Sequence, residues 1–155
     1  MRWRRCCAAW RWAIGADQVT RSPEETEDLA ARLAAGFSGG EVVLLSGELG
    51  AGKTTFVRGL ARGVGADPEE VASPTFVLLT RYPGRLVLHH ADLYRLQGTG
   101  DERELGLEEL PGPGGVLAVE WSERLSSPPW PRAVRIRLEH AGGDARRVHI
   151  EPEGA

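Results

Sequence analysis

The sequence predicts an α/β fold: a mixed sheet with flanking helices and a C-terminal antiparallel hairpin. Two continuous apolar runs, at residues 42–45 and 116–119, are typical of strands that are buried on both faces. Apolar residues at helical spacing lie on both sides of the first run, and apolar and charged residues alternate strictly near the C-terminus. Buried strands of the parallel type together with a hairpin indicate an α/β sheet with antiparallel additions.

The first helix is predicted over residues 22–35. Ser22 is a suitable N-cap, Pro23 is suited to the first helical position, and Glu25 completes a capping box. Gly36 follows the last apolar position and is expected to end the helix.

The other elements are predicted in the same way, from the spacing of apolar residues and from the turn residues that separate them. A glycine-rich loop follows the first apolar run, and Pro-Gly and Gly-Gly pairs mark two later turns. In chain order, these elements are a helix at 53–64, strands at 76–79 and 86–88, a short acidic helix at 101–110, a strand at 116–119, and hairpin strands at 134–138 and 148–150.

The length of 155 residues fits one domain, which we expect over residues 18–155. Arg11 interrupts the apolar stretch near the N-terminus and leaves too short a core for a secretory signal. Residues 1–17 are therefore expected to be either a disordered N-terminal extension or the result of a start codon assigned too far upstream. Residues 1–12 carry four arginines and no acid, which gives them a charge of +4. Because the net charge of the whole chain is −3, residues 13–155 together carry −7. An acidic body argues against autonomous nucleic-acid binding.

The cysteine content predicts neither a disulfide framework nor a zinc site. Cys6 and Cys7 are neighbours with no second pair to bridge, and no Cys/His metal spacing occurs. No apolar run approaches the roughly 18 residues that a membrane-spanning helix needs. We therefore expect a cytoplasmic protein without a membrane partner.

The glycine-rich loop matches the P-loop pattern G-x-x-x-x-G-K-[ST] through Gly47, Gly52, Lys53 and Thr54, so the predicted α/β fold is of the P-loop NTPase-like class. Glycines let such a loop curl so that successive N–H groups point at one anion, and the following helix N-terminus favours negative charge. Lys53 is the only lysine, beside 18 arginines, and would reach the β- and γ-phosphates. The Thr54 hydroxyl would bind Mg2+, and Thr55 would contact the α-phosphate.

The nucleotide is expected to be ATP, with Mg2+ as its metal. Guanine is read by an [NT]-K-x-D motif, which needs a second lysine that this chain does not have. Adenine is therefore favoured by elimination.

Two acids lie where buried strands end, Asp92 after the strand at 86–88 and Glu120 after residues 116–119. Ligands bind at this rim in α/β proteins, and Mg2+ prefers one or two carboxylates with phosphate oxygens. The alternative is that each acid simply leaves its strand for solvent. His89 and His90 have no third ligand at a suitable spacing, so polar or packing roles are favoured for both.

Several segments together resemble the TsaE (formerly YjeE) family, bacterial ATPases of tRNA threonylcarbamoyladenosine biosynthesis. The resemblance covers about residues 18–151 in the family's order and spacing. The segments that carry it are GELGAGKTT at 47–55, SPTF at 73–76, HADLYRL at 90–96, ELG at 104–106 and VEW at 119–121.

The resemblance implies an accessory role. Such proteins bind ATP, hydrolyse it slowly alone and work with the TsaD–TsaB complex, which transfers a threonylcarbamoyl group to adenosine 37 of tRNA. Hydrolysis is thought to reset that complex between turnovers, and tRNA is contacted only indirectly, through the complex.

The resemblance also assigns roles to residues. Glu120 and Thr54 would hold the metal, Asp92 would be the Walker-B-like acid, and Thr75 would belong to a switch-like segment near the γ-phosphate. Trp121 would lie against the nucleotide or belong to the core. The expected catalytic residues are Asp92, Glu120 and Thr75, and the expected ATP-binding residues are Glu48, Leu49, Gly50, Ala51, Gly52, Lys53, Thr54, Thr55 and Trp121.

Two other functional classes compete with this interpretation. A small-molecule P-loop kinase has about this length but needs an acceptor pocket and usually an Arg-rich lid, whereas residues 101–115 are acidic and contain one arginine. An RNA-binding module would need basic residues interleaved with aromatic ones after position 20, and the sequence lacks them.

Overall fold

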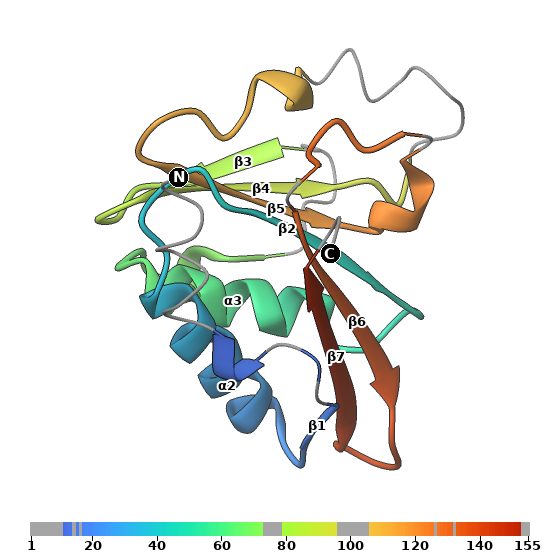
Figure 1. Ribbon diagram of the computed structural model, residues 1–155. Coiled ribbons are helices and arrows are strands. Elements are labelled where there is room, and N and C mark those ends of the chain that lie inside the picture. The colour runs from blue at the N-terminus through green and yellow to red at the C-terminus, as the bar shows by residue number, and fades with distance from the viewer. Residues whose placement is uncertain are drawn as a thin grey trace.

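The computed structural model describes residues 11–13, 15, 17–72, 79–95, 106–125, 127–131 and 133–152. Within these residues, seven strands form one mixed sheet in the order β1-β7-β6-β2-β5-β4-β3 (Figure 1). The strands are β1 (Gln18–Thr20), β2 (Val42–Gly47), β3 (Leu79–Tyr82), β4 (Val87–Asp92), β5 (Gly115–Glu120), β6 (Val134–His140) and β7 (Arg146–Pro152).

The middle of the sheet is parallel and its margins are antiparallel. Strand β2 pairs in parallel with both β5 and β6, and β5 pairs in parallel with β4. Strand β3 is antiparallel to β4, and the β6–β7 hairpin is extended by β1. The predicted fold class, a P-loop NTPase-like mixed sheet with a C-terminal hairpin, is therefore confirmed.

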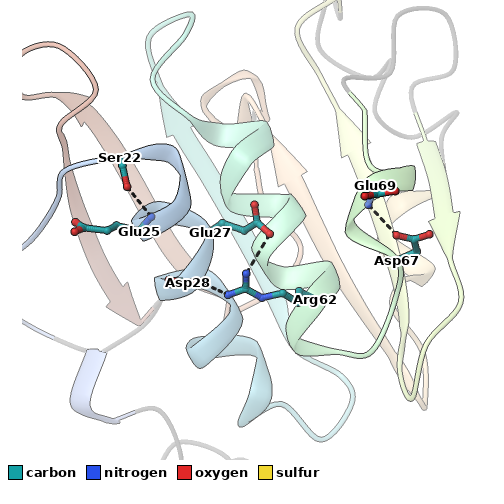
Figure 2. A network of polar contacts seen from close by, with 7 residues as sticks. All are labelled: Ser22, Glu25, Glu27, Asp28, Arg62, Asp67 and Glu69. Atoms are coloured by element: carbon teal, nitrogen blue, oxygen red, sulfur yellow. Dashed lines mark hydrogen bonds and ion pairs between the residues drawn. The ribbon is translucent and has the colours of Figure 1, made fainter.

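The first long helix, α2 (Pro23–Ala35), begins as predicted at the N-cap Ser22. The backbone N–H of Glu25 donates to the Ser22 hydroxyl at 3.1 Å (Figure 2). The Glu25 carboxylate accepts from the N–H of Arg21 at 2.6 Å, one residue earlier than in an ordinary capping box. Both contacts satisfy N–H groups at the start of the helix.

Helix α2 packs against the second helix, α3 (Lys53–Gly63), on one face of the sheet (Figure 1). The backbones approach so closely that a Cβ on Gly59 would lie 2.2 Å from the carbonyl oxygen of Glu27. On the outer surface, Arg62 bridges Glu27 at 3.3 Å and Asp28 at 2.5 Å (Figure 2). Glycine is therefore required for packing at a position where helix propensity disfavours it.

The opposite face of the sheet is covered by turns and loops (Figure 1). Leu107, Leu125 and Trp130 pack there against buried side chains of β2, β4 and β5. Because both faces are covered, β5 is buried along its length and β2 is buried over residues 42–45, as their continuous apolar runs predict.

Some sequence predictions fall partly or wholly outside the described residues. Of the strand predicted at 76–79, residues 76–78 are not described, and the observed strand starts at Leu79. Of the acidic helix predicted at 101–110, the described part holds one 3-10 turn, Leu107–Glu109. Strand β1 was not predicted, because three residues are too short to show a period.

The predicted disordered extension lies mostly outside the described residues and stays a prediction. The described part contains a 3-10 turn, Arg11–Ala13, whose Ala13 is buried in the core beside α2. The Arg32 guanidinium lies 4.2 Å from the centre of the Trp12 ring. Across the described residues, no helix combines the length and apolarity required to cross a bilayer.

Candidate functional site

The candidate site is built on the loop that joins β2 to α3. At the end of β2, Gly47 has φ +144°, and a Cβ there would lie 2.4 Å from the carbonyl oxygen of Leu138 in β6. The N-cap of α3 is Gly52, with φ +101° and no side chain to cap the helix. The loop therefore curls over the end of the sheet, and the positively polarised helix N-terminus has no side-chain cap.

Lys53 is folded back onto this loop and is only 5% exposed. Its Nζ donates to the carbonyl oxygens of Gly47 at 2.5 Å and Glu48 at 2.9 Å, and lies 3.9 Å from the centre of the Trp121 ring. Burial lowers the pKa of Lys53, and the nearby acids, Glu123 first among them, partly oppose that shift. The loop thus holds a partly desolvated cation.

Thr54 and Glu120 meet across the end of the sheet. The Thr54 hydroxyl lies 2.9 and 3.2 Å from the two carboxylate oxygens of Glu120, to which it donates. Glu120 is 2% exposed, and its Oε2 is also in contact with Nε2 of His90. A buried carboxylate needs such partners, since without them its desolvation would be costly.

Asp92 lies beside Glu120 because their strands are parallel and the two residues are register partners. Its carboxylate is buried, and Oδ1 accepts from the backbone N–H of Tyr94 at 2.9 Å. Both acids end their strands at the edge of the sheet where the loop lies, instead of extending into solvent.

Trp121 has the left-handed backbone angle φ +58°, which is uncommon for a residue other than glycine. Its ring lies over Nζ of Lys53 and 5.0 Å from the ring of Tyr94, and it also packs against the core that contains Trp130. Trp121 therefore faces both the loop and the core, and its contact with a nucleotide stays a prediction.

These residues surround a cavity of about 240 Å³. Of the predicted site residues, Ala51 belongs to the loop and is fully buried, Glu48 lines an adjoining cavity of about 620 Å³, and Thr75 lies outside the described residues. The lining of the 240 Å³ cavity consists of predicted residues, namely Leu49, Gly50, Gly52, Lys53, Thr54, Thr55, Asp92, Glu120 and Trp121.

Two supporting residues were missed in the sequence. His90, expected to be polar or packing, contacts Glu120 directly. Arg146, at the start of β7, donates from Nε to the Ala51 carbonyl at 3.1 Å and from Nη2 to the Gly50 carbonyl at 3.2 Å. Arg146 lies 95 residues beyond the loop, so no local pattern could have indicated this contact.

The donor groups fit Mg2+ with nucleotide phosphates better than a metal held by protein alone. Within the described residues, no group of three or more His, Cys, Asp or Glu could hold a metal ion. Thr54, Asp92 and Glu120 instead offer one hydroxyl and two buried carboxylates on one cavity. Mg2+ bound with phosphates uses one or two carboxylates and completes its shell with phosphate oxygens and water.

The sheet, the loop and the acids at the strand ends define an α/β protein of the P-loop NTPase-like class. The model of the family described as "Threonylcarbamoyl adenosine biosynthesis protein TsaE" matches residues 20–148. The chain belongs to the TsaE family, whose proteins act in the biosynthesis of threonylcarbamoyladenosine in tRNA.

Individual relatives agree with the family match. The chain is 42% identical to the Treponema pallidum tRNA threonylcarbamoyladenosine biosynthesis protein TsaE, over 85% of this chain and 97% of the relative. It is 43% identical to the Aquifex aeolicus protein of the same name, over 85% and 92%. The crystal structure of Bacillus subtilis YdiB superposes with a TM-score of 0.68 at 32% identity, covering 90% of this chain and 86% of that one.

Proposed function

We propose that this protein binds ATP with Mg2+ at the loop of residues 47–55 and hydrolyses it slowly. One observation carries the proposal: the only lysine of the chain shares a cavity of about 240 Å³ with Thr54, Glu120 and Asp92. A lysine, an uncapped helix N-terminus and two acids are the groups that bind phosphate oxygens and a divalent cation.

Each group has a defined task in the proposed complex. Lys53 exchanges its two loop carbonyls for phosphate oxygens, which are stronger partners because both members of the contact are charged. Thr54 and Glu120 hold Mg2+, which when bound neutralises charge on the phosphates, and Asp92 orients water or supports the metal. Loop N–H groups bind the phosphate chain without reorganisation, because the glycines already hold the curled backbone.

Hydrolysis by the isolated protein is slow in this proposal. Among the described residues that line the 240 Å³ cavity, Lys53 is the single cation and there is no arginine. An arginine directed at the γ-phosphate is worth about 10³–10⁵ in rate in related phosphoryl-transfer enzymes. Part of the charge that develops on the γ-phosphoryl oxygens is therefore unmatched until a partner binds.

The proposed partner is the TsaD–TsaB complex, and the proposed process is formation of threonylcarbamoyladenosine at position 37 of tRNA. Family membership supports this role, because the family's proteins act in that biosynthesis. The protein would contact tRNA only through the complex, and ATP hydrolysis would reset the complex after each transfer.

Steady-state ATPase measurements test this proposal. We expect turnover far below about 1 s⁻¹ for the pure protein, by analogy with unassisted P-loop GTPases, and a clear rise when TsaD–TsaB is added. The modified nucleoside should form over multiple turnovers only with the parent protein and not with Lys53→Ala. Phosphoryl transfer to a small acceptor without partners would instead identify a small-molecule P-loop kinase.

A further inference from the structure

His90 is a fully buried polar residue that contacts a second buried ionisable group, Glu120. It lies in β4, is 0% exposed, and directs Nε2 at the Glu120 carboxylate. Among the described residues, its Nδ1 has no hydrogen-bond partner. A ring that served only to fill the core would gain nothing from its nitrogens and would incur their desolvation.

The strand register places His90 where it can reach Glu120. Its partner in β5 is Ala118, two residues before Glu120, and the short alanine side chain leaves room for the imidazole. Leu88, His90 and Asp92 alternate along β4 with residues of the opposite face, so His90 and Asp92 share the face toward α3.

Glu120 is consequently held from two sides by two different elements. Thr54 of α3 donates its hydroxyl to the carboxylate, and His90 of β4 contacts Oε2. Together these contacts fix the rotation of the carboxylate about its terminal bond, a torsion that is otherwise broad. Residues that hydrogen-bond a ligating carboxylate set its orientation, and losing one typically costs about 10–100-fold in metal affinity.

We infer that His90 is a positioning residue, which orients the Glu120 carboxylate so that it and Thr54 receive a divalent cation together with nucleotide phosphates. His90 does not itself touch the cation, and it acts entirely through Glu120. The inference rests on the proposed function, since it concerns how the MgATP site is held.

The test compares two replacements that have similar volume and differ in hydrogen bonding. His90→Gln keeps an N–H at about the reach of Nε2, whereas His90→Met keeps the bulk without a donor. The matched control is His89→Met, because His89 is a buried neighbour on the same strand and points to the opposite face of the sheet. Titrating Mg2+ at fixed ATP in a calorimeter gives the Mg2+ concentration for half-maximal binding.

For His90→Met we expect this midpoint to rise about tenfold, whereas binding of ATP without metal stays within about twofold of the parent. His90→Gln should lie within about threefold of the parent, and His89→Met should leave the midpoint unchanged. Equal midpoints for His90→Met and the parent, or equal losses in His90→Met and His90→Gln, would overturn the inference.

Two further results complete the test. If His90→Met does not fold, His90→Asn replaces it, because its shorter amide cannot reach Glu120. The Mg2+ midpoint of His90→Asn is then compared with those of the parent and His90→Gln, with the same expected results. If the parent itself does not bind ATP, the proposed function fails, and the role of His90 fails with it. Binding by the parent combined with an unchanged midpoint in the variants removes only the role of His90.

Discussion

The two ends of helix α3 are stabilised in opposite ways. At the C-terminal end, Arg85 donates to four carbonyl oxygens: Phe37 at 2.8 Å, Ala34 at 2.9 Å, Gly63 at 3.2 Å and Ala35 at 3.3 Å. One guanidinium therefore binds the last turns of both α2 and α3. A cation is also the favoured charge at a helix C-terminus.

The N-terminal end of α3 is not closed in this way. Its N-cap is a glycine without a side chain, and the ammonium of Lys53 is held by loop carbonyls and an aromatic ring. Lys53 is buried at some electrostatic cost, as its lowered pKa shows. The protein thus neutralises one end with its own side chain and keeps the other available for an anion.

This difference separates residues that stabilise the fold from residues that serve the site. Groups at a binding site are commonly kept in arrangements that are not the most stable, and stability comes from elsewhere in the fold. We therefore expect substitutions at the Arg85 end to change the free energy of unfolding, and substitutions at the loop end to change ligand affinity.

The largest effect is expected for Lys53→Ala. The variant should lose about 100-fold in ATP affinity, because two charge-assisted hydrogen bonds to phosphate are removed. Its free energy of unfolding should stay within about 1 kcal/mol of the parent, since the loss of two carbonyl contacts is offset by removal of a buried charge. Calorimetric titration and urea denaturation measure the two quantities.

Lys53→Arg is the control for charge. A planar guanidinium cannot occupy the position of a compact ammonium between phosphate oxygens, so affinity should remain low although the charge is kept. Unchanged affinity in a folded Lys53→Ala protein would show that the phosphate site lies elsewhere.

The next effect is expected for Arg85→Ala. The substitution leaves four carbonyls at two helix ends without their charged donor, so we expect a loss of about 2 kcal/mol in the free energy of unfolding. ATP affinity should be unchanged, because Arg85 lies at the far end of α3 from the loop. Arg85→Lys should recover part of the stability, and a fall in affinity greater than the fall in stability would contradict the separation of the two ends.

A smaller effect is expected when residues 1–13 are removed. The truncation removes Ala13 from the core and so exposes the side chains that pack around it. It also removes the Trp12 ring, which contacts Arg32 in the last turn of α2. A loss of about 1 kcal/mol in unfolding free energy is expected, with ATP affinity unchanged. Equal melting temperatures for the two proteins would show that this stretch does not stabilise the domain.

The smallest effect is a dependence on pH. Burial lowers the pKa of Lys53 in the folded protein below its ordinary value of 10.5, so the unfolded chain binds more protons in that interval. Stability should therefore rise with pH between the lowered pKa and 10.5. Subtracting the pH profile of Lys53→Ala from that of the parent removes the contributions of other titrating groups. One such group is Tyr82, because burial raises its pKa. A difference that does not change with pH would mean that Lys53 is not desolvated.

Much of the loop end could be predicted from sequence, because its signals are local. A buried strand, a glycine-rich turn and a helix start follow one another within 22 residues, 42–63, and each leaves its own pattern of period and composition. The same holds for the Ser22 cap of α2 and for the Gly-Gly turn of the hairpin. The acids Asp92 and Glu120 were found because each follows a predicted strand.

Contacts that join distant segments could not be predicted in the same way. The sequence determined which residues form the loop, its helix and the strands that end in acids, because hydrogen bonding and burial within one element depend on neighbouring residues. Only the tertiary structure decided that His90 contacts Glu120, that Arg85 binds two helix ends and that Gly59 touches α2. Those contacts depend on strand register and on the distance between helices, which the whole core sets and no short segment encodes.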